Sequence, residues 1–177
     1  MIRVDAHHHV WRIERGDYGW LTPDLPIHRD YTLDDLRPSL GDIAATVLVQ
    51  AAATEAETAY MLEVARASEG LVRGVVGWVD VAAPAASARI IDLARDNLLK
   101  GLRPMLQDIA DTDWILRAEC PPAIEALIAT GLRFDAHPAT PSSGLASALR
   151  AASILARGDR PWRQDRNRAG RVAALGG

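Results

Sequence analysis

Three consecutive histidines near the start of the chain are the residues whose type and spacing point most directly to chemistry. They lie in the segment Asp5-Ala6-His7-His8-His9-Val10-Trp11, directly after a short apolar run. Because side chains alternate between the two faces of a strand, His7 and His9 are expected to share one face and His8 to lie on the other. Two imidazoles on one face can bind a single divalent ion. The alternative interpretation is a histidine cluster without a metal.

Further polar and aromatic residues follow the next apolar runs at the point where each run ends. Arg103 can hold a carboxylate through two parallel hydrogen bonds, or it can form an ion pair at the rim of the fold. Gln50 can donate to a substrate oxygen or make a structural hydrogen bond. Trp78 can line a pocket or fill the core. Asp80 follows it, and this position suits a helix N-cap equally well.

Five short apolar runs separated by helical patterns have to position these side chains. The expected strands are Ile2–Asp5, Thr46–Gln50, Leu71–Gly77, Leu98–Arg103 and Leu132–Asp135. Alternation of strands and helices predicts parallel pairing, either in a doubly wound sheet or in a (β/α) barrel. A glycine-rich phosphate loop is absent from the first turn, which weakens the nucleotide-binding form. Polar residues recur at the carboxyl ends of the strands, where barrel active sites lie, so we predict an α/β fold of the barrel type.

The expected helices carry recognisable start and stop signals. Thr54 with Glu57 three residues later has the spacing of a capping box, and the helix that follows should end near Gly70. Pro84 is placed as a first-turn proline of the next helix, and Pro121 opens a third. Between the first strand and the second, the segment Gly16–Asp30 is long and irregular. It can be a functional lid or a plain surface loop.

The composition limits the class of protein. The chain has 177 residues, 49% of them hydrophobic, with a net charge of −3, which is typical of a globular protein. Its single cysteine, Cys120, excludes an internal disulfide and fits a reducing compartment. No secretory leader and no apolar run of membrane-spanning length is visible, so we expect a cytoplasmic protein that does not bind a membrane.

Taken together, the motifs resemble the lactonase branch of the amidohydrolase superfamily, also called the amidohydrolase-2 family. The resemblance runs nearly continuously from residue 2 to Ala136. It is carried by the first-strand motif DAHHHVW at 5–11 and by GDYGWLTP at 16–23, VLVQA at 47–51, TEAET at 54–58, GVVGWVD at 74–80, GLRPMLQD at 101–108 and Trp114.

This resemblance implies a (β/α)8 barrel that opens a sugar lactone or a related carbonyl ring. His7 and His9 would be metal ligands for one divalent ion, zinc or manganese, and family members differ in whether they need it. Arg103, Gln50, Trp20 and Trp78 would contact a small-molecule substrate. The family's later histidines and the aspartate that acts as general base have no counterpart in residues 137–177. We therefore expect an incomplete (β/α)8 barrel of about five βα units, in which activity of this chain is in doubt.

Residues 137–177 differ sharply from residues 1–136. The first 136 residues hold 21 of the 23 acidic residues, whereas the last 41 hold 7 arginines and only 2 acidic residues. Read one nucleotide later with permitted codons, His137 to Gln164 can spell a segment that ends in the family's Asp-His-Gly-Ala-Lys. Our interpretation is an out-of-frame tail rather than a nucleic-acid-binding extension, which would be expected to interleave aromatic residues with its arginines. A non-catalytic metal- or ligand-binding remnant is the other alternative. The unpaired edges of an open barrel predict low stability or self-association as a homo-oligomer.

Overall fold

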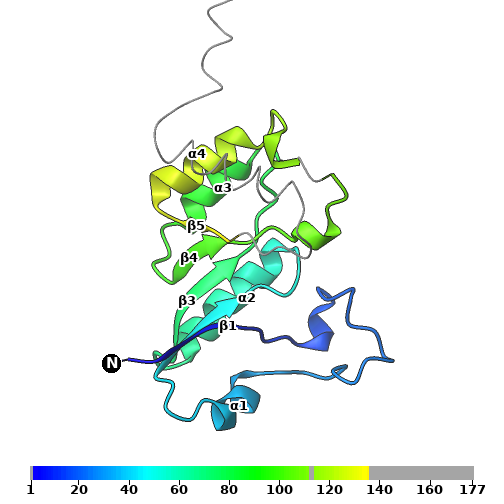
Figure 1. Cartoon of the computed structure of the whole chain (residues 1–177), viewed down its shortest axis with the longest axis vertical. Helices are drawn as coiled ribbons and strands as arrows, with labels where there is room; N and C mark the ends of the chain where they lie inside the picture. The colour runs from blue at the N-terminus through cyan, green and yellow to red at the C-terminus, as the bar shows by residue number, and fades with distance from the viewer. Residues whose placement is uncertain (1, 112–113, 136–177) are drawn as a thin grey trace, which may run out of the picture.

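The computed structural model describes residues 2–111 and 114–135 and contains one parallel sheet whose strands lie in chain order. Figure 1 shows them side by side, beginning with β1 close to the N-terminus. The five strands are β1 (Val4–His8), β2 (Ala45–Val49), β3 (Val72–Gly77), β4 (Leu99–Leu102) and β5 (Arg133–Phe134). Every neighbouring pair is parallel.

Helical segments join each strand to the next. The α-helices are α1 (Leu33–Leu36), α2 (Glu55–Ala67), α3 (Ala86–Leu93) and α4 (Pro121–Thr130), and the short 3-10 turns are η1 (Ile13–Arg15), η2 (Arg37–Ser39), η3 (Leu106–Asp108) and η4 (Trp114–Leu116). A doubly wound sheet reverses its strand order at a switch point, whereas this sheet adds each new strand on the same side. The α/β fold, and within it about five units of an incomplete (β/α) barrel, is therefore confirmed.

The core lies between the sheet and the three longer helices. Leu48 of β2 and Leu102 of β4 pack in one apolar cluster with Met61 of α2, Ile90 of α3 and Leu127 of α4, and none of the five is more than 2% exposed. One buried side chain from each helix thus fixes that helix on the sheet. Figure 1 shows α3 and α4 lying beside each other near β4 and β5.

Helix α2 approaches the end of β3 closely because the strand ends in glycine. A Cβ atom at Gly77 would lie 2.5 Å from Cγ2 of Thr58. The Thr58 hydroxyl accepts a 2.8 Å hydrogen bond from the backbone N–H of Trp78 and donates to its carbonyl at 3.1 Å. This pair of bonds holds the first residue after β3 against α2.

Several details differ from the sequence-based expectation. Strand β1 continues through His8, so that the histidines belong to the strand and its immediate end. Asp80 is not an N-cap, because α3 begins at Ala86 and the Asp80 carboxylate instead accepts from the backbone N–H of Ala82 at 3.0 Å. Thr54 caps α2 as predicted, yet the reciprocal half of the capping box is missing, because the Glu57 side chain turns away to bind other amides.

Two predictions concern membranes and the tail. Across residues 2–111 and 114–135, no helix combines the length and the apolar character that a membrane span needs. The division of the chain after residue 136, and the interpretation of residues 137–177 as out of frame, lie outside the described residues.

Candidate active site

One candidate functional side chain follows directly after each of the first four strands. His9 follows β1, Gln50 follows β2, Trp78 follows β3 and Arg103 follows β4. The backbone ladder continues through two of these residues, since the N–H groups of Gln50 and Arg103 donate to carbonyls of β3 at 2.9 and 2.8 Å. Because parallel strands end at the same edge of the sheet, these side chains gather at one end of it.

His7 and His9 face each other at this end. Their Nε2 atoms lie 3.2 Å apart, and the rings meet edge to face with centroids 4.9 Å apart. His9 Nδ1 lies 2.8 Å from the carbonyl oxygen of Val49. A carbonyl can only accept, so His9 carries its proton on Nδ1, and in the neutral ring Nε2 is an acceptor. The sequence prediction that the two rings lie together is confirmed.

Arg103 makes Nε2 of His7 a hydrogen-bond acceptor as well. Its Nη1 lies 3.4 Å from His7 Nε2, and a guanidinium can only donate. In the neutral rings, two acceptor nitrogens then face each other at 3.2 Å, an arrangement that a shared cation would stabilise. Two imidazoles bound to a tetrahedral zinc ion at about 2.0–2.1 Å would place their nitrogens roughly 3.3 Å apart. The donor set and its spacing therefore fit a divalent metal.

The two histidines do not make a complete set of ligands by themselves. Among residues 2–111 and 114–135, no group of three or more His, Cys, Asp or Glu side chains is arranged to hold a metal ion. A zinc ion on His7 and His9 would take its remaining ligands from water, a substrate or another part of the protein. A pair of protein ligands with open positions is closer to a catalytic site than to a structural one.

His8 lies on the opposite face, as its position in the strand predicted. It is buried, and its Nε2 lies 2.9 Å from the hydroxyl of Thr46. Burial lowers the pKa of His8 below its usual 6.5. The central histidine is thus a neutral packing residue of β1 and takes no part in the pair formed by its neighbours.

Arg103 and Gln50 are both buried and linked to each other. The Gln50 side chain is fully buried, and its Nε2 donates to the Arg103 carbonyl at 3.0 Å and contacts the Met105 sulfur at 3.0 Å. Each of the two side chains also has a buried polar atom with no hydrogen-bond partner within the described part of the chain, Oε1 of Gln50 and Nε of Arg103. Gln50 therefore makes the structural hydrogen bond that the sequence allowed and keeps an unused acceptor beside it.

The two tryptophans have different surroundings, since Trp20 lies against the turn after β2 and Trp78 borders a pocket whose lining includes none of His7, His9, Gln50 and Arg103. The Trp20 indole donates to the Ala51 carbonyl at 2.8 Å and stacks edge to face on Trp11, with centroids 5.6 Å apart. Trp78 is half-buried and borders a pocket of about 410 Å³ together with Asp80, Met105 and Trp114. The Gly16–Asp30 segment, through Trp20, thus reaches the residue that follows Gln50.

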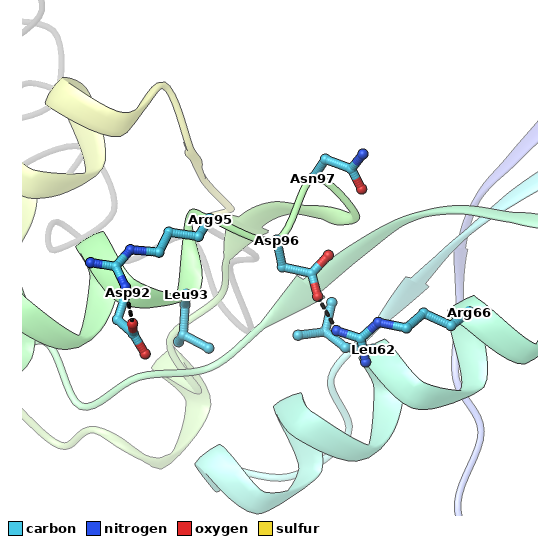
Figure 2. Close-up of a pocket in the computed structure, with 7 residues that line it drawn as sticks. All are labelled: Leu62, Arg66, Asp92, Leu93, Arg95, Asp96 and Asn97. Carbon is cyan, nitrogen blue, oxygen red and sulfur yellow. Dashed lines mark hydrogen bonds and ion pairs between the residues drawn. The ribbon is translucent and has the colours of Figure 1, made fainter.

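A second hollow lies at the other end of the sheet, where β4 begins, and it differs in character (Figure 2). It has a volume of about 660 Å³, and its charged side chains neutralise one another: Arg66 pairs with Asp96, and Arg95 pairs with Asp92 at 3.2 Å. Both arginines are more than half exposed. A groove whose charges are already paired with each other in water offers little to a ligand.

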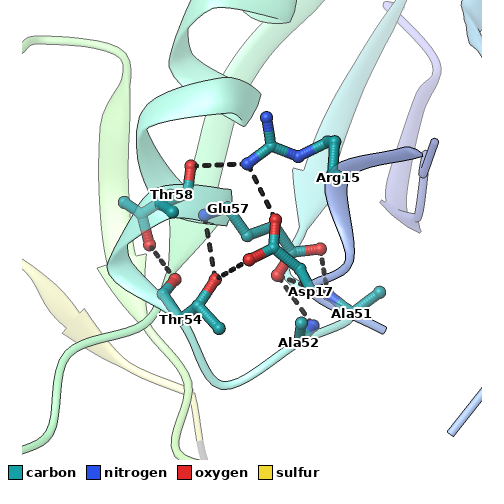
Figure 3. A network of polar contacts seen from close by, with 8 residues as sticks. Arg15, Asp17, Ala51, Ala52, Thr54, Glu57 and Thr58 are labelled. Carbon is teal, nitrogen blue, oxygen red and sulfur yellow. Dashed lines mark hydrogen bonds and ion pairs between the residues drawn. The ribbon is translucent and has the colours of Figure 1, made fainter. Parts of the chain in front are cut away.

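A buried carboxylate next to the site was not predicted from the sequence (Figure 3). Glu57 is fully buried, and it accepts hydrogen bonds from the backbone N–H groups of Ala51 and Ala52, the closest at 2.7 Å. Burial raises the pKa of Glu57 to about 7, although these amides act in the opposite direction. The network continues from Thr54 to Asp17 at 2.9 Å and from Asp17 to Arg15 at 2.8 Å. The capping-box pattern concealed this role, because it assigned the Glu57 side chain to the helix end.

The fold and the strand-end site define the class of protein, and a comparison of the sequence with family models agrees. The model of the Amidohydrolase family (Amidohydro_2) matches residues 4–169. The chain belongs to this family.

Particular relatives narrow the comparison. L-fucono-1,5-lactonase from Burkholderia ambifaria is 44% identical over 137 residues, covering 76% of this chain and 47% of the relative. The protein of the same name from Burkholderia multivorans is 39% identical over 113 residues, covering 62% and 38%. The chain therefore spans less than half the length of these two curated relatives.

Solved structures give the same picture. A crystal structure of an amidohydrolase from Burkholderia multivorans with bound zinc is 34% identical and superimposes with a TM-score of 0.68. The match covers 76% of this chain and 48% of that one. The fold of the described residues thus corresponds to about half of a complete amidohydrolase structure.

Proposed function

We propose that the strand-end site belongs to a hydrolase that opens a sugar lactone by attack of water. The observation that carries this proposal is the pair of imidazoles, His7 and His9, whose acceptor nitrogens lie 3.2 Å apart at the carboxyl ends of parallel strands. Both curated relatives are named as lactonases of L-fucono-1,5-lactone, which suggests a six-membered sugar 1,5-lactone as the substrate class.

His7 and His9 would hold one divalent ion, for which zinc and manganese are the candidates. Such an ion, when bound, polarises a carbonyl oxygen and lowers the pKa of water. The carbonyl of Val49 keeps the His9 ring in the tautomer that presents Nε2 to the ion. The solved relative with bound zinc supports the choice of metal.

Arg103 and Gln50 would bind oxygen atoms of the lactone. Each has a buried polar atom without a partner among the described residues, a donor on Arg103 Nε and an acceptor on Gln50 Oε1. Buried polar atoms are normally paired, and an unpaired one at a site is a reason to expect a ligand or a water. A lactone with hydroxyl groups supplies both an acceptor for the arginine and a donor for the glutamine.

Trp78 and Trp20 would line the substrate from two sides. Trp78 borders the 410 Å³ pocket, a volume in the range of small-molecule sites. Trp20 is 40% exposed, so its ring keeps a free face near the strand ends. Aromatic faces pack well against the C–H faces of a sugar ring.

The direct experiment is a turnover assay of the full chain with L-fucono-1,5-lactone, in which acid release is followed with and without added zinc. We expect release above the spontaneous rate that is lost in His7→Ala and retained in His28→Ala, which removes a histidine of the segment between β1 and α1. Equal rates for the wild type, for His7→Ala and for buffer alone would refute lactonase activity of this chain.

A second candidate function is binding without turnover. It is favoured by the donor count, since the described residues supply only two metal ligands and no third acidic or imidazole group beside them. Zinc binding measured by calorimetry, combined with no lactone hydrolysis, would support this alternative. Hydrolysis above the spontaneous rate would exclude it.

A further inference from the structure

The loop between β1 and α1 is docked on the turn between β2 and α2. Tyr18 and Leu21 are buried, and they pack with Ala51 and Ala52 in a small apolar cluster of their own. This cluster is separate from the main core beneath the helices. The position of residues 16–30, which we call the 16–30 loop, therefore depends on where the Ala51–Ala52 pair is held.

Hydrogen bonds also hold the 16–30 loop in place, both where the chain enters and leaves it and along its length. At the base, Trp11 and Tyr31 form an antiparallel bridge with backbone hydrogen bonds of 2.9 and 3.0 Å. Further along, the Trp20 indole donates to the Ala51 carbonyl at 2.8 Å, and Asp17 accepts from the Thr54 hydroxyl at 2.9 Å. Both of these partners belong to the turn that follows β2.

Glu57 holds that turn from helix α2 (Figure 3). Its two carboxylate oxygens accept from the N–H groups of Ala51 and Ala52 at distances from 2.7 to 3.1 Å. Both backbone groups of Ala51 are thus hydrogen-bonded, its N–H to Glu57 and its carbonyl to Trp20. The Glu57 backbone N–H in turn donates to the Thr54 hydroxyl at 3.0 Å.

We propose that Glu57 is a positioning residue, which fixes Ala51 and Ala52 so that the 16–30 loop and Trp20 cover the strand-end site. Its link to catalysis rests on the proposed function, whereas the docking of the loop does not. Glu57 acts through the turn, whose Ala51 and Ala52 amides its carboxylate binds in Figure 3. The carboxylate suits this role because its two oxygens serve two adjacent amides at once.

The primary test compares Glu57→Gln with Glu55→Gln, which lies in the same first turn of α2 with an exposed side chain. Hydrogen exchange of individual amides is measured by NMR in the full chain at pH 8, where Glu57, with a pKa of about 7, carries the charge that Gln lacks. A carboxamide offers one acceptor oxygen and places a donor where the second lay, so one amide of the pair is left unmatched.

We expect Glu57→Gln to speed exchange at Ala51, Ala52 and the Trp20 indole at least tenfold, while the amides of Met61 and Leu62 remain unchanged. Glu55→Gln should alter none of these sites. A uniform acceleration at all sites, or no acceleration at the turn and the indole, would overturn the positioning role. This experiment needs no ligand, so it tests whether Glu57 holds the turn under the 16–30 loop even if the proposed function is wrong.

A second arm tests the link to the ligand with L-fuconate, the acid that hydrolysis of L-fucono-1,5-lactone would give, and with zinc. Glu57→Gln should weaken L-fuconate binding while zinc affinity stays as in the wild type. Equal L-fuconate binding by both proteins would overturn the coverage of the site by the loop. Failure of the wild type to bind L-fuconate at all would count against the proposed function and against that coverage.

If Glu57→Gln fails to fold, Trp20→Phe provides a second test, because it weakens the contact between the 16–30 loop and the turn from the loop. It removes the indole donor, which bonds to Ala51, and keeps an aromatic ring. We expect weaker L-fuconate binding and faster exchange at Leu21, with no change in zinc affinity. Unchanged exchange and unchanged binding would contradict the proposal.

Discussion

The two ends of the parallel sheet hold very different polar chemistry. At the carboxyl ends, His7 and His9 face each other, and the buried Gln50 and Arg103 each keep a polar atom that no described residue satisfies. At the amino end of β4, the larger hollow is lined by charged groups such as Arg66 and Asp96 that pair with one another in solvent. Size alone would select the end at which the charges are already paired.

The two ends therefore differ in how their polar groups are satisfied as well as in the size of the hollow. An exposed ion pair contributes little to stability, and its charges are already neutralised. A buried donor or acceptor without a partner costs free energy in the folded state, so it persists where a ligand satisfies it. Four experiments test this contrast.

The largest effect is expected on metal binding. His9→Ala removes one of two imidazole ligands and the bond to Val49, so zinc affinity measured by calorimetry should fall by on the order of 100-fold or more. His28→Ala removes a histidine far along the 16–30 loop and should leave the affinity unchanged. Equal losses in both variants would mean that zinc binds elsewhere.

The close packing of α2 against the carboxyl end of β3 predicts an effect on stability. Gly77→Ala would place a methyl group 2.5 Å from Thr58 and disturb its two hydrogen bonds to Trp78. We expect a loss of about 2–3 kcal/mol in the free energy of unfolding, measured with urea. The matched variant Gly19→Ala has open space at its Cβ and should be close to neutral. A neutral Gly77→Ala would show that α2 is not packed this tightly.

The buried carboxylate beside the site predicts a dependence of stability on pH. Burial raises the pKa of Glu57 from an ordinary 4.5 to about 7, with Asp17, Tyr18 and Arg15 as the ionisable groups around it. Between these values the folded chain keeps a proton that the unfolded chain has lost. The contribution of Glu57 therefore falls as pH rises from about 5 to 7, by at most roughly 3 kcal/mol.

Urea unfolding at pH 5, 6, 7 and 8 measures this contribution. The wild type should lose stability over that range relative to Glu57→Gln, which cannot titrate at this position. Parallel pH profiles for the two proteins would show that the carboxyl group titrates in its ordinary range despite its burial.

The smallest effect belongs to the opposite end of the sheet. Arg66→Ala breaks a surface ion pair with Asp96, in which the Arg66 side chain is 57% exposed. We expect a change of less than about 0.5 kcal/mol in stability and none in zinc affinity. A large loss of stability or of zinc affinity would show that the hollow at the amino end of β4 matters more than its paired charges suggest, and would contradict the comparison between the two ends.

Much of this fold could be predicted from the sequence because local signals were strong. Runs of β-branched residues separated by capped helices indicated five parallel strands, and Thr54 and Pro121 marked helix starts that the structure bears out. The alternation of side chains along β1 separated His8 from its neighbours correctly. The boundaries were less certain, since β1 extends to His8 through pairing with β2, which no local pattern encodes.

The roles of buried polar groups could not be predicted in the same way. Glu57 sits at a position where a capping box is the ordinary outcome, and only the fold of the turn after β2 brings two other amides within its reach. Gln50 and Arg103 were found from their places at strand ends, while their mutual hydrogen bond depends on the register of three strands. Their contacts with a substrate stay predictions, as does the out-of-frame origin proposed for residues 137–177.

The most direct test of the strand-end site is a zinc titration of the full chain followed by the 15N resonances of the histidine side chains. We expect the Nε2 signals of His7 and His9 to shift together at one equivalent of zinc, while those of His8 and His28 stay in place. If zinc leaves the His7 and His9 signals unchanged, or shifts the His28 signals as much as theirs, the pair is not a metal site.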